Sequence, residues 1–296
     1  MAARVANKLY ALPPDPAQQT RQHQQRNFRI SSCKAAISKA DAIEEMEHAL
    51  TIPIPEMIFG DNFAAVEHVP SGWRIEFNAR DALDQVDKTG ENMLQVAYAR
   101  NWSASREQTS AGIKEVVRPY DWSYSTTYRG TLNAGEECTK DQSMAQGATT
   151  EKESRSFQPT TTPIPIELLK RQDPILFNDE VVLYESELDD NGVSVLSVKF
   201  RVHKHRMLLL CRLFMRLDNV VVRIRDTRIY VDFDTDEVTR EYTVKEAGYE
   251  LVKQKLLMKG LRPDGIIVAL RDANQIADLL PVLDKTLESV SPKSDL

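Results

Sequence analysis

The chain has few cysteines, three among 296 residues, at positions 33, 138 and 211. This number and wide spacing exclude a disulfide-stapled scaffold and match no zinc or redox motif. Glycine is also scarce, at 11 residues, and neither the G-x-x-x-x-G-K nor the G-x-G-x-x-G phosphate-binding pattern occurs. The G-x-S-x-G and H-E-x-x-H patterns are absent too. We therefore expect no cofactor and no enzyme of these classes.

Long apolar runs and an excess of positive charge are also lacking. Runs as short as Met207–Cys211 cannot span a bilayer, and the first residues carry no apolar signal-peptide core. Asp and Glu number 44 against 38 Lys and Arg, which gives a net charge of −6 and argues against a dedicated nucleic-acid binder. We expect a soluble intracellular protein, in the cytoplasm with the nucleus as a second compartment, that binds neither membrane nor nucleic acid.

The chain does contain enough apolar material for a sizeable core, at 42% of its residues. Residues 1–26 are rich in proline and glutamine and predict an unstructured tail. Residues 133–158 are polar and aperiodic, which predicts a disordered insertion, with a boundary between two domains as the alternative. We therefore predict a single α+β domain over residues 27–290 and a flexible C-terminus over 291–296.

Alternating apolar residues and tight turns dominate the second half. Extended runs over 180–188, 198–202, 207–217, 220–224, 228–233 and 238–244 are separated by turn residues such as Asn191-Gly192, where positive φ angles are expected. A further hairpin is predicted over 63–77. The pattern predicts a meander of antiparallel strands with peripheral helices. One helix is expected over 249–256, and a second along the apolar stripe of 276–290, interrupted at Pro281.

Two groups of residues can support chemistry. His203 and His205 share a strand face and can grip a metal together, although no third ligand is evident, so a solvated strand end is the simpler interpretation. Arg212 and Arg216 also share a strand face, because their positions differ by an even number, and so do Arg223 and Arg225. Guanidinium groups on a rigid sheet suit carboxylates, including a peptide C-terminus. The alternative is a solvated or internally paired face, and an Arg228–Asp226 pair is one such pairing.

Several ordered motifs carry a family resemblance. They are Ile54–Asn62 (IPEMIFGDN), Ile75–Leu83 (IEFNARDAL), Pro119–Trp122 (PYDW) with Tyr128–Thr131 (YRGT), and a long stretch from Val181 that contains Asn191–Ser194 (NGVS), Asp226–Arg228 (DTR) and Arg240–Thr243 (REYT). The stretch from about residue 28 to about residue 245, outside the insertion, resembles the Tip-forty-one-like (TIPRL) family of regulators in TOR signalling. Residues 246–296 match this family only loosely.

The resemblance implies a fold, a function and a set of site residues. It implies a single α+β domain built on antiparallel sheets and a non-catalytic protein. Its implied partners are the catalytic subunits of type 2A serine/threonine protein phosphatases, including their C-terminal tail. The partner-binding positions that the resemblance carries over are Asp81, Ile164, Ile224, Asp226 and Arg228, to which the carboxylate argument adds Arg212 and Arg216.

Two other functions remain open at this point. One is a metal-dependent hydrolase that uses His203 or His205, for which bound zinc or manganese is the test. The other is a binder of RNA or another acidic ligand through the arginine-rich hairpin, for which strongly salt-dependent retention is the test.

Overall fold

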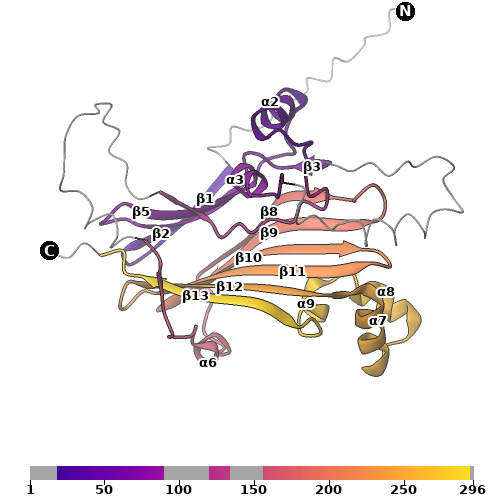
Figure 1. Ribbon diagram of the computed structural model, residues 1–296. Helices are drawn as coiled ribbons and strands as arrows, with labels where there is room; N and C mark the ends of the chain where they lie inside the picture. Colours follow the sequence, from indigo (N-terminus) through magenta and orange to yellow (C-terminus); the bar gives the residue numbers. More distant parts are fainter. Residues whose placement is uncertain (1–18, 90–119, 134–155, 294–296) are drawn as a thin grey trace, which may run out of the picture.

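The computed structural model describes residues 19–89, 120–133 and 156–293, which form two stacked antiparallel sheets with short helices at the periphery (Figure 1). The five-stranded sheet contains β1 (Thr20–Gln25), β2 (Phe28–Cys33), β4 (Phe63–His68), β5 (Trp73–Asn78) and β6 (Thr131–Asn133), in that order. The eight-stranded sheet contains β3 (Met57–Ile58), β7 (Gln158–Pro159), β8 (Phe177–Ser186), β9 (Gly192–Val202), β10 (Arg206–Leu217), β11 (Val221–Asp232), β12 (Glu237–Gly248) and β13 (Val282–Val290). Its spatial order is β3-β8-β9-β10-β11-β12-β13-β7. The predicted α+β class, antiparallel meander and single domain are confirmed.

The helices are short and lie on both sides of the molecule. They are α2 (Ala40–Leu50), α3 (Ala79–Asp84), α6 (Ile166–Leu169), α7 (Tyr249–Met258), α8 (Pro263–Ala269) and α9 (Ala273–Ile276). Figure 1 shows α2 and α3 on the side of the five-stranded sheet, and α6 and α7 beyond the opposite face of the eight-stranded sheet. Within the described ranges, none of these helices is long and apolar enough to cross a membrane.

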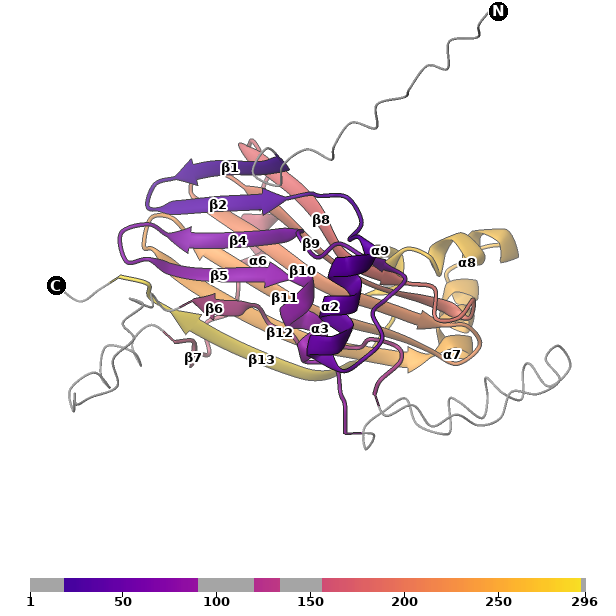
Figure 2. The ribbon, with the colours of Figure 1, turned by 90° about the horizontal axis from the view of Figure 1, so that it is seen from above.

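The two faces of the eight-stranded sheet are covered differently. Alternate residues of β10, such as Leu209 and Cys211, join the main core with Phe28 and Trp73 of the five-stranded sheet. We call this the inner face; Figure 2 shows the five-stranded sheet lying over it. The intervening residues point to the outer face, where one end is covered by α7, α8 and α9 over a second apolar cluster that includes Ile224. The strict alternation of β-strands therefore decides which side chains can reach which surface.

The turns differ in detail from the prediction. Between β8 and β9 the positive φ angles fall on Leu188, Asp189 and Asp190, not on Asn191-Gly192. Asn191 is instead buried and donates from its side chain to the carbonyls of Leu188 and Asp189 at 2.9 and 2.7 Å. Gly192 opens β9 where a Cβ would lie 1.9 Å from the carbonyl oxygen of Arg216. The glycine is therefore required by close approach of a neighbouring strand.

The C-terminal helix predicted through residue 290 is wrong beyond Pro281. Asp272 caps the short helix α9 by accepting a hydrogen bond from the Asn274 N–H at 2.9 Å. Residues 282–290 then form β13, which pairs with β12 from Lys245 to Val238. Leu283 and Leu287 have helical spacing, but Pro281 stops the helix and the unpaired edge of β12 supplies backbone partners.

The limits of the predicted tail and insertion also shift. Thr20–Gln25, which we placed in an unstructured tail, forms β1, because its extended backbone pairs with β2 along six residues although few of its side chains are buried. At the end of the predicted insertion, Phe157 is buried and Gln158–Pro159 forms β7. Residues 1–18, 134–155 and 294–296, on which the rest of these predictions falls, lie outside the described residues.

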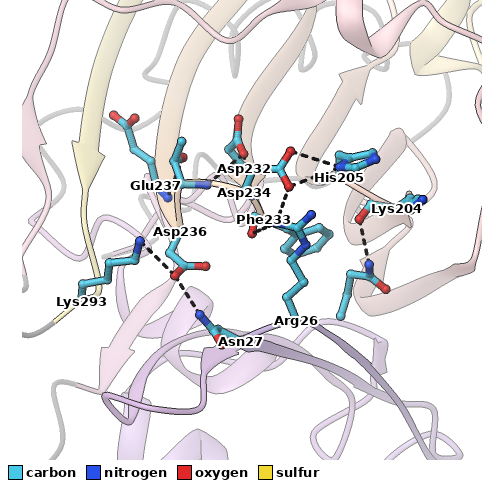
Figure 3. Close-up of polar contacts among 12 residues, drawn as sticks. Arg26, Asn27, Lys204, His205, Asp232, Phe233, Asp234, Asp236, Glu237 and Lys293 are labelled. Carbon is cyan, nitrogen blue, oxygen red and sulfur yellow. Dashed lines mark hydrogen bonds and ion pairs between the residues drawn. The ribbon is translucent and has the colours of Figure 1, made fainter.

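A set of polar contacts joins the two sheets at one end (Figure 3). Arg26, in the turn between β1 and β2, donates to the Phe233 carbonyl at 3.1 Å and forms an ion pair with Asp234. Asn27 donates to the Asp236 carboxylate at 2.8 Å, and Lys293 lies 3.3 Å from the same carboxylate. These contacts fix the turn between β11 and β12 against the other sheet.

Candidate functional site

The centre of the candidate site is a chain of charges across the outer face, which we call the outer-face ion network: Arg212, Asp226, Arg228, Glu241 and Lys285. Arg212 donates to both oxygens of Asp226 at 2.7 and 2.8 Å. Arg228 donates to Asp226 and to Glu241, both at 2.9 Å, and Lys285 lies 2.6 Å from Glu241. The predicted Arg228–Asp226 pair is therefore present within a larger network that spans β10, β11, β12 and β13.

Strand register places these residues side by side. Arg212 lies directly opposite Asp226 in the β10–β11 pairing, and Arg228 lies opposite Glu241 in the β11–β12 pairing. Asp226 is fully buried. Burial tends to lower the pKa of Arg212, but the hydrogen bond and the charge of Asp226 outweigh it and raise that pKa above its ordinary value. Arg212 therefore stays charged, and its charge is compensated by the carboxylate that it contacts.

The network differs in exposure along its length. The Arg212 side chain is 9% exposed, and its remaining nitrogen donates to the Asn274 side chain of α9 at 2.8 Å. The Arg228 side chain is 23% exposed and the Lys285 side chain is 51% exposed. Only the Arg228–Glu241–Lys285 end can therefore meet a carboxylate from outside without first opening the sheet.

The other residues carried over lie in different places. Ile224 is fully buried in the apolar cluster beneath α7, α8 and α9. Arg216, which shares the outer face, donates to Asp218 at 2.6 Å and to the Leu270 carbonyl at 3.0 Å. Ile164 is buried in the segment between β7 and α6.

Asp81 lies on the far side of the molecule, in α3. Its backbone N–H donates to the Asn78 side chain at 2.9 Å, which caps the helix, and its carboxylate accepts from Asn78 and Thr131. Asp81 and the outer-face ion network therefore lie on opposite sides of the eight-stranded sheet, and the structure does not bring the seven predicted residues into one patch.

The remaining arginines of the predicted hairpin point inward. Arg223 donates to Glu246 at 2.6 Å and to Ser125 at 2.8 Å on the inner face. Nearby Asp121, of the PYDW motif, is buried, and burial raises the pKa of its carboxyl group. The arginines thus divide between two faces and several are paired internally, which leaves no continuous basic surface for RNA along this hairpin.

The two histidines do not form a metal centre in the described part of the chain. His203 contacts the Pro174 carbonyl at 3.0 Å, and His205 contacts Asp234 at 3.1 Å. Across residues 19–89, 120–133 and 156–293, no group of three or more His, Cys, Asp or Glu side chains is arranged to hold a metal. Cys211 is buried on the inner face, where burial raises the pKa of its thiol, which disfavours the reactive thiolate.

Sequence reasoning missed Glu241, Asn274 and Lys285. Glu241 belongs to the REYT motif, and its alternation with Tyr242 was a usable signal for the face it occupies. Asn274 lies in α9 and Lys285 in β13, a strand that the sequence did not predict, so no strand register connected them to Arg212 or Glu241.

Two packed antiparallel sheets with a charged, partly exposed outer face define an α+β scaffold that can bind a charged group at its surface. The profile of the TIP41-like family matches residues 57–253. A TIP41-like protein of Homo sapiens is 38% identical over 264 residues, covering 89% of this chain and 86% of the relative. The type 2A phosphatase activator TIP41 of Saccharomyces cerevisiae is 35% identical over 280 residues, covering 89% and 73%. The chain belongs to the TIP41-like family, as the sequence motifs indicated.

Proposed function

We propose that this protein is a non-catalytic regulator of type 2A serine/threonine protein phosphatases, acting by binding their catalytic subunits in TOR signalling. The observation that carries the proposal is the match to relatives named as type 2A phosphatase activators, which extends over most of the chain in Saccharomyces cerevisiae and in Schizosaccharomyces pombe. A binding role in the cytoplasm, and in the nucleus as a second compartment, belongs to the same proposal.

We propose the exposed end of the outer-face ion network as the place where the phosphatase tail is held. Arg228 already binds the Glu241 carboxylate at 2.9 Å, and Lys285 binds the other oxygen of Glu241 at 2.6 Å. A carboxylate at the end of a peptide has the same chemistry as Glu241, so it can take its place between the two cations. The fully buried Asp226 keeps Arg228 oriented through a hydrogen bond of 2.9 Å.

The first experiment measures capture of a purified type 2A catalytic subunit, intact and without its C-terminal tail, by the full chain. We expect capture of the intact subunit, weaker capture of the shortened one, and a further loss with Arg228→Glu. Arg201→Glu is the matched control, because it reverses an exposed charge on a different strand, β9, outside the ion network. If capture is the same with and without the tail, and the same for Arg228→Glu, the phosphatase binds at another site on this protein. If neither subunit is captured, the proposed function is wrong.

A second measurement separates two modes of regulation. Phosphatase activity is followed on a small phenyl phosphate and on a phosphoprotein, each with increasing amounts of this chain. Loss on the phosphoprotein alone indicates that the bound chain blocks access of a large substrate. An equal effect on both substrates indicates a change at the phosphatase active site itself.

A further inference from the structure

A second feature of the outer face lies at the end opposite α7, α8 and α9, where Tyr230 follows Arg228 by two residues on the same face of β11. A cavity of about 770 Å³ opens there between the segment around α6 and the turns that join β9 to β10 and β11 to β12. The argument rests on six of its lining residues: Leu168, Asp173, Leu176, Lys204, Arg206 and Tyr230. This volume lies within the range of ligand sites, roughly 300–1,000 Å³.

Two side chains in this cavity can donate a hydrogen bond to a ligand. Arg206 is buried, with 6% of its surface exposed. One of its guanidinium nitrogens donates to Asp173, but its Nε has no acceptor in the described structure. A buried donor without a partner is costly, so the Arg206 Nε favours an acceptor that arrives with a ligand. Tyr230 lines the same cavity, and its hydroxyl is a second group that can donate to such an acceptor.

The charges around the cavity favour an anionic acceptor. Of the acidic lining residues, Asp234 is paired with Arg26 and contacts His205, as Figure 3 shows, and Asp232 accepts from the backbone N–H groups of Asp234 and Thr235. Asp173 is held by Arg206, whose hydrogen bond lowers the pKa of that carboxyl. Lys204 lines the cavity and has no ion-pair partner within the described ranges.

The other wall of the cavity is apolar. Leu168 and Leu176 line it, and they are 37% and 47% exposed. Large apolar side chains at the rim of a charged cavity suit a peptide in which an acidic residue is flanked by apolar ones, because the flanking residues can cover them. A free inorganic anion would use the donors but leave these leucines in water.

We propose that this cavity binds a short peptide segment of a protein partner through one acidic side chain, with Tyr230, Lys204 and Arg206 meeting the anion and Leu168 and Leu176 meeting its apolar neighbours. The anion is a carboxylate or a phosphate monoester, since both accept several hydrogen bonds at once. The site shares no residue with the proposed tail-binding end of the ion network. A failure of this proposal therefore leaves the proposed phosphatase function untouched, and the reverse also holds.

The test is a titration of the ¹⁵N-labelled full chain, followed by amide chemical shifts. The probes are acetyl-Leu-Glu-Leu-amide, its phosphoserine counterpart acetyl-Leu-pSer-Leu-amide, neutral acetyl-Leu-Gln-Leu-amide and inorganic phosphate. We expect saturable shifts in residues 203–206 and 230 with at least one of the two anionic peptides, and at least about tenfold weaker binding of the neutral peptide, because a hydrogen bond to a charged group contributes that much. The stronger of the two anionic peptides identifies the source of the anion.

Variants tie the binding to the named side chains. Tyr230→Phe removes only the hydroxyl, and Lys204→Gln removes an exposed charge, so neither change is expected to unfold the chain. Each should weaken the better peptide about tenfold or more, while Lys199→Gln, on β9 outside the cavity and paired with Glu180, should not. Equal binding of charged and neutral peptides, the same affinity for phosphate alone, or unchanged binding by Tyr230→Phe and Lys204→Gln would each overturn the proposal.

Discussion

Asp226 is the residue on which the outer-face ion network depends. It is fully buried and accepts three hydrogen bonds, two from Arg212 and one from Arg228. A carboxylate in this position compensates the buried guanidinium group of Arg212 and orients Arg228, which also binds Glu241. Its contribution to binding a partner therefore acts through Arg228, which it orients, and its first effect is on folding.

Removal of Asp226 should destabilise the protein. We expect Asp226→Ala to lower the free energy of unfolding by about 3–5 kcal/mol, because it leaves the buried guanidinium of Arg212 unpaired. Asp218→Ala is the control: Asp218 is 41% exposed, and its pair with Arg216 should contribute less than about 1 kcal/mol. Urea unfolding followed by circular dichroism measures both. A loss for Asp226→Ala as small as that for Asp218→Ala would contradict the structural role.

His68 makes stability depend on pH. It is buried, its Nδ1 contacts Ser71 at 2.7 Å, and its Nε2 lies 3.8 Å from the buried carboxylate of Asp236, with Lys293 on the same carboxylate. Burial lowers its pKa below the ordinary 6.5, and the charge of Asp236 only partly opposes this. Between the folded pKa and 6.5 the unfolded chain binds a proton that the folded chain does not, so stability is lost as pH falls below about 6.5.

The measurement compares wild type with His68→Gln in urea at pH 7.5 and pH 5.5. Wild type should lose more stability over this interval than the variant does, by at most about 1.4 kcal/mol per pH unit. The variant's own destabilisation does not matter, since only the two pH slopes are compared. Equal slopes would show that His68 takes up a proton as readily in the folded chain as in the unfolded one.

At the scale of elements, strands with local signals were predictable and edge strands were not. The strands β8 to β12 combine period-two alternation with compact turns, and these two features define a meander from neighbouring residues alone. β1 and β13 carry mixed polar side chains, and what makes them strands is backbone pairing with β2 and β12. α7, α8 and α9 separate β12 from β13 in the sequence, so no local pattern identifies that pairing. β1 pairs with the adjacent β2 across a two-residue turn, but its polar side chains show no apolar alternation that would mark it as a strand.

Gly192 tests the close approach of two strands. Gly192→Ala should destabilise the protein by at least about 2 kcal/mol, because its Cβ would lie 1.9 Å from the Arg216 carbonyl oxygen and the backbone must move. Gly265→Ala is the control: it lies in α8, where a Cβ meets its nearest neighbour at 4.0 Å, and alanine favours the helix by up to about 1 kcal/mol. Thermal unfolding should move in opposite directions for the two variants, and a neutral Gly192→Ala would contradict this packing.

The whole molecule should unfold as one unit. One apolar core contains Trp73 and Phe28 of the five-stranded sheet together with Leu209 of the eight-stranded sheet. The Asn27–Asp236 hydrogen bond and the Arg26–Asp234 ion pair join the layers at their edge. Because neither sheet can bury its inner face without the other, we expect a single cooperative transition.

Asn27→Asp tests the polar contacts that join the two sheets at their edge. It places a second carboxylate against buried Asp236, so we expect a loss of about 1–2 kcal/mol, whereas Asn178→Asp on the exposed part of β8 should change little. Tryptophan fluorescence and far-ultraviolet circular dichroism should shift together in urea. Two separated transitions would show that the sheets are independent units.

The site was less predictable than the fold, because it is assembled at the scale of the whole molecule. The spacing of Arg212 and Arg216, and of Arg223 and Arg225, correctly placed each pair on one face of a strand, and the alternative Arg228–Asp226 pair is present. It did not reveal that α7, α8 and α9 cover Ile224, or that Asp81 lies on the other side of the sheet. Which face is covered depends on tertiary packing, which residue spacing within a strand does not encode.

The most direct test of the proposed function is the dissociation constant between the purified full chain and a type 2A phosphatase catalytic subunit, with a type 1 catalytic subunit as the comparison. Biolayer interferometry measures this constant when the phosphatase is immobilised and this protein is added as a concentration series. The account predicts saturable, equimolar binding to the type 2A subunit, at least tenfold tighter than to the type 1 subunit, which corresponds to about 1.4 kcal/mol. Equal affinity for both subunits, or no binding to the type 2A subunit by a folded protein, would contradict it.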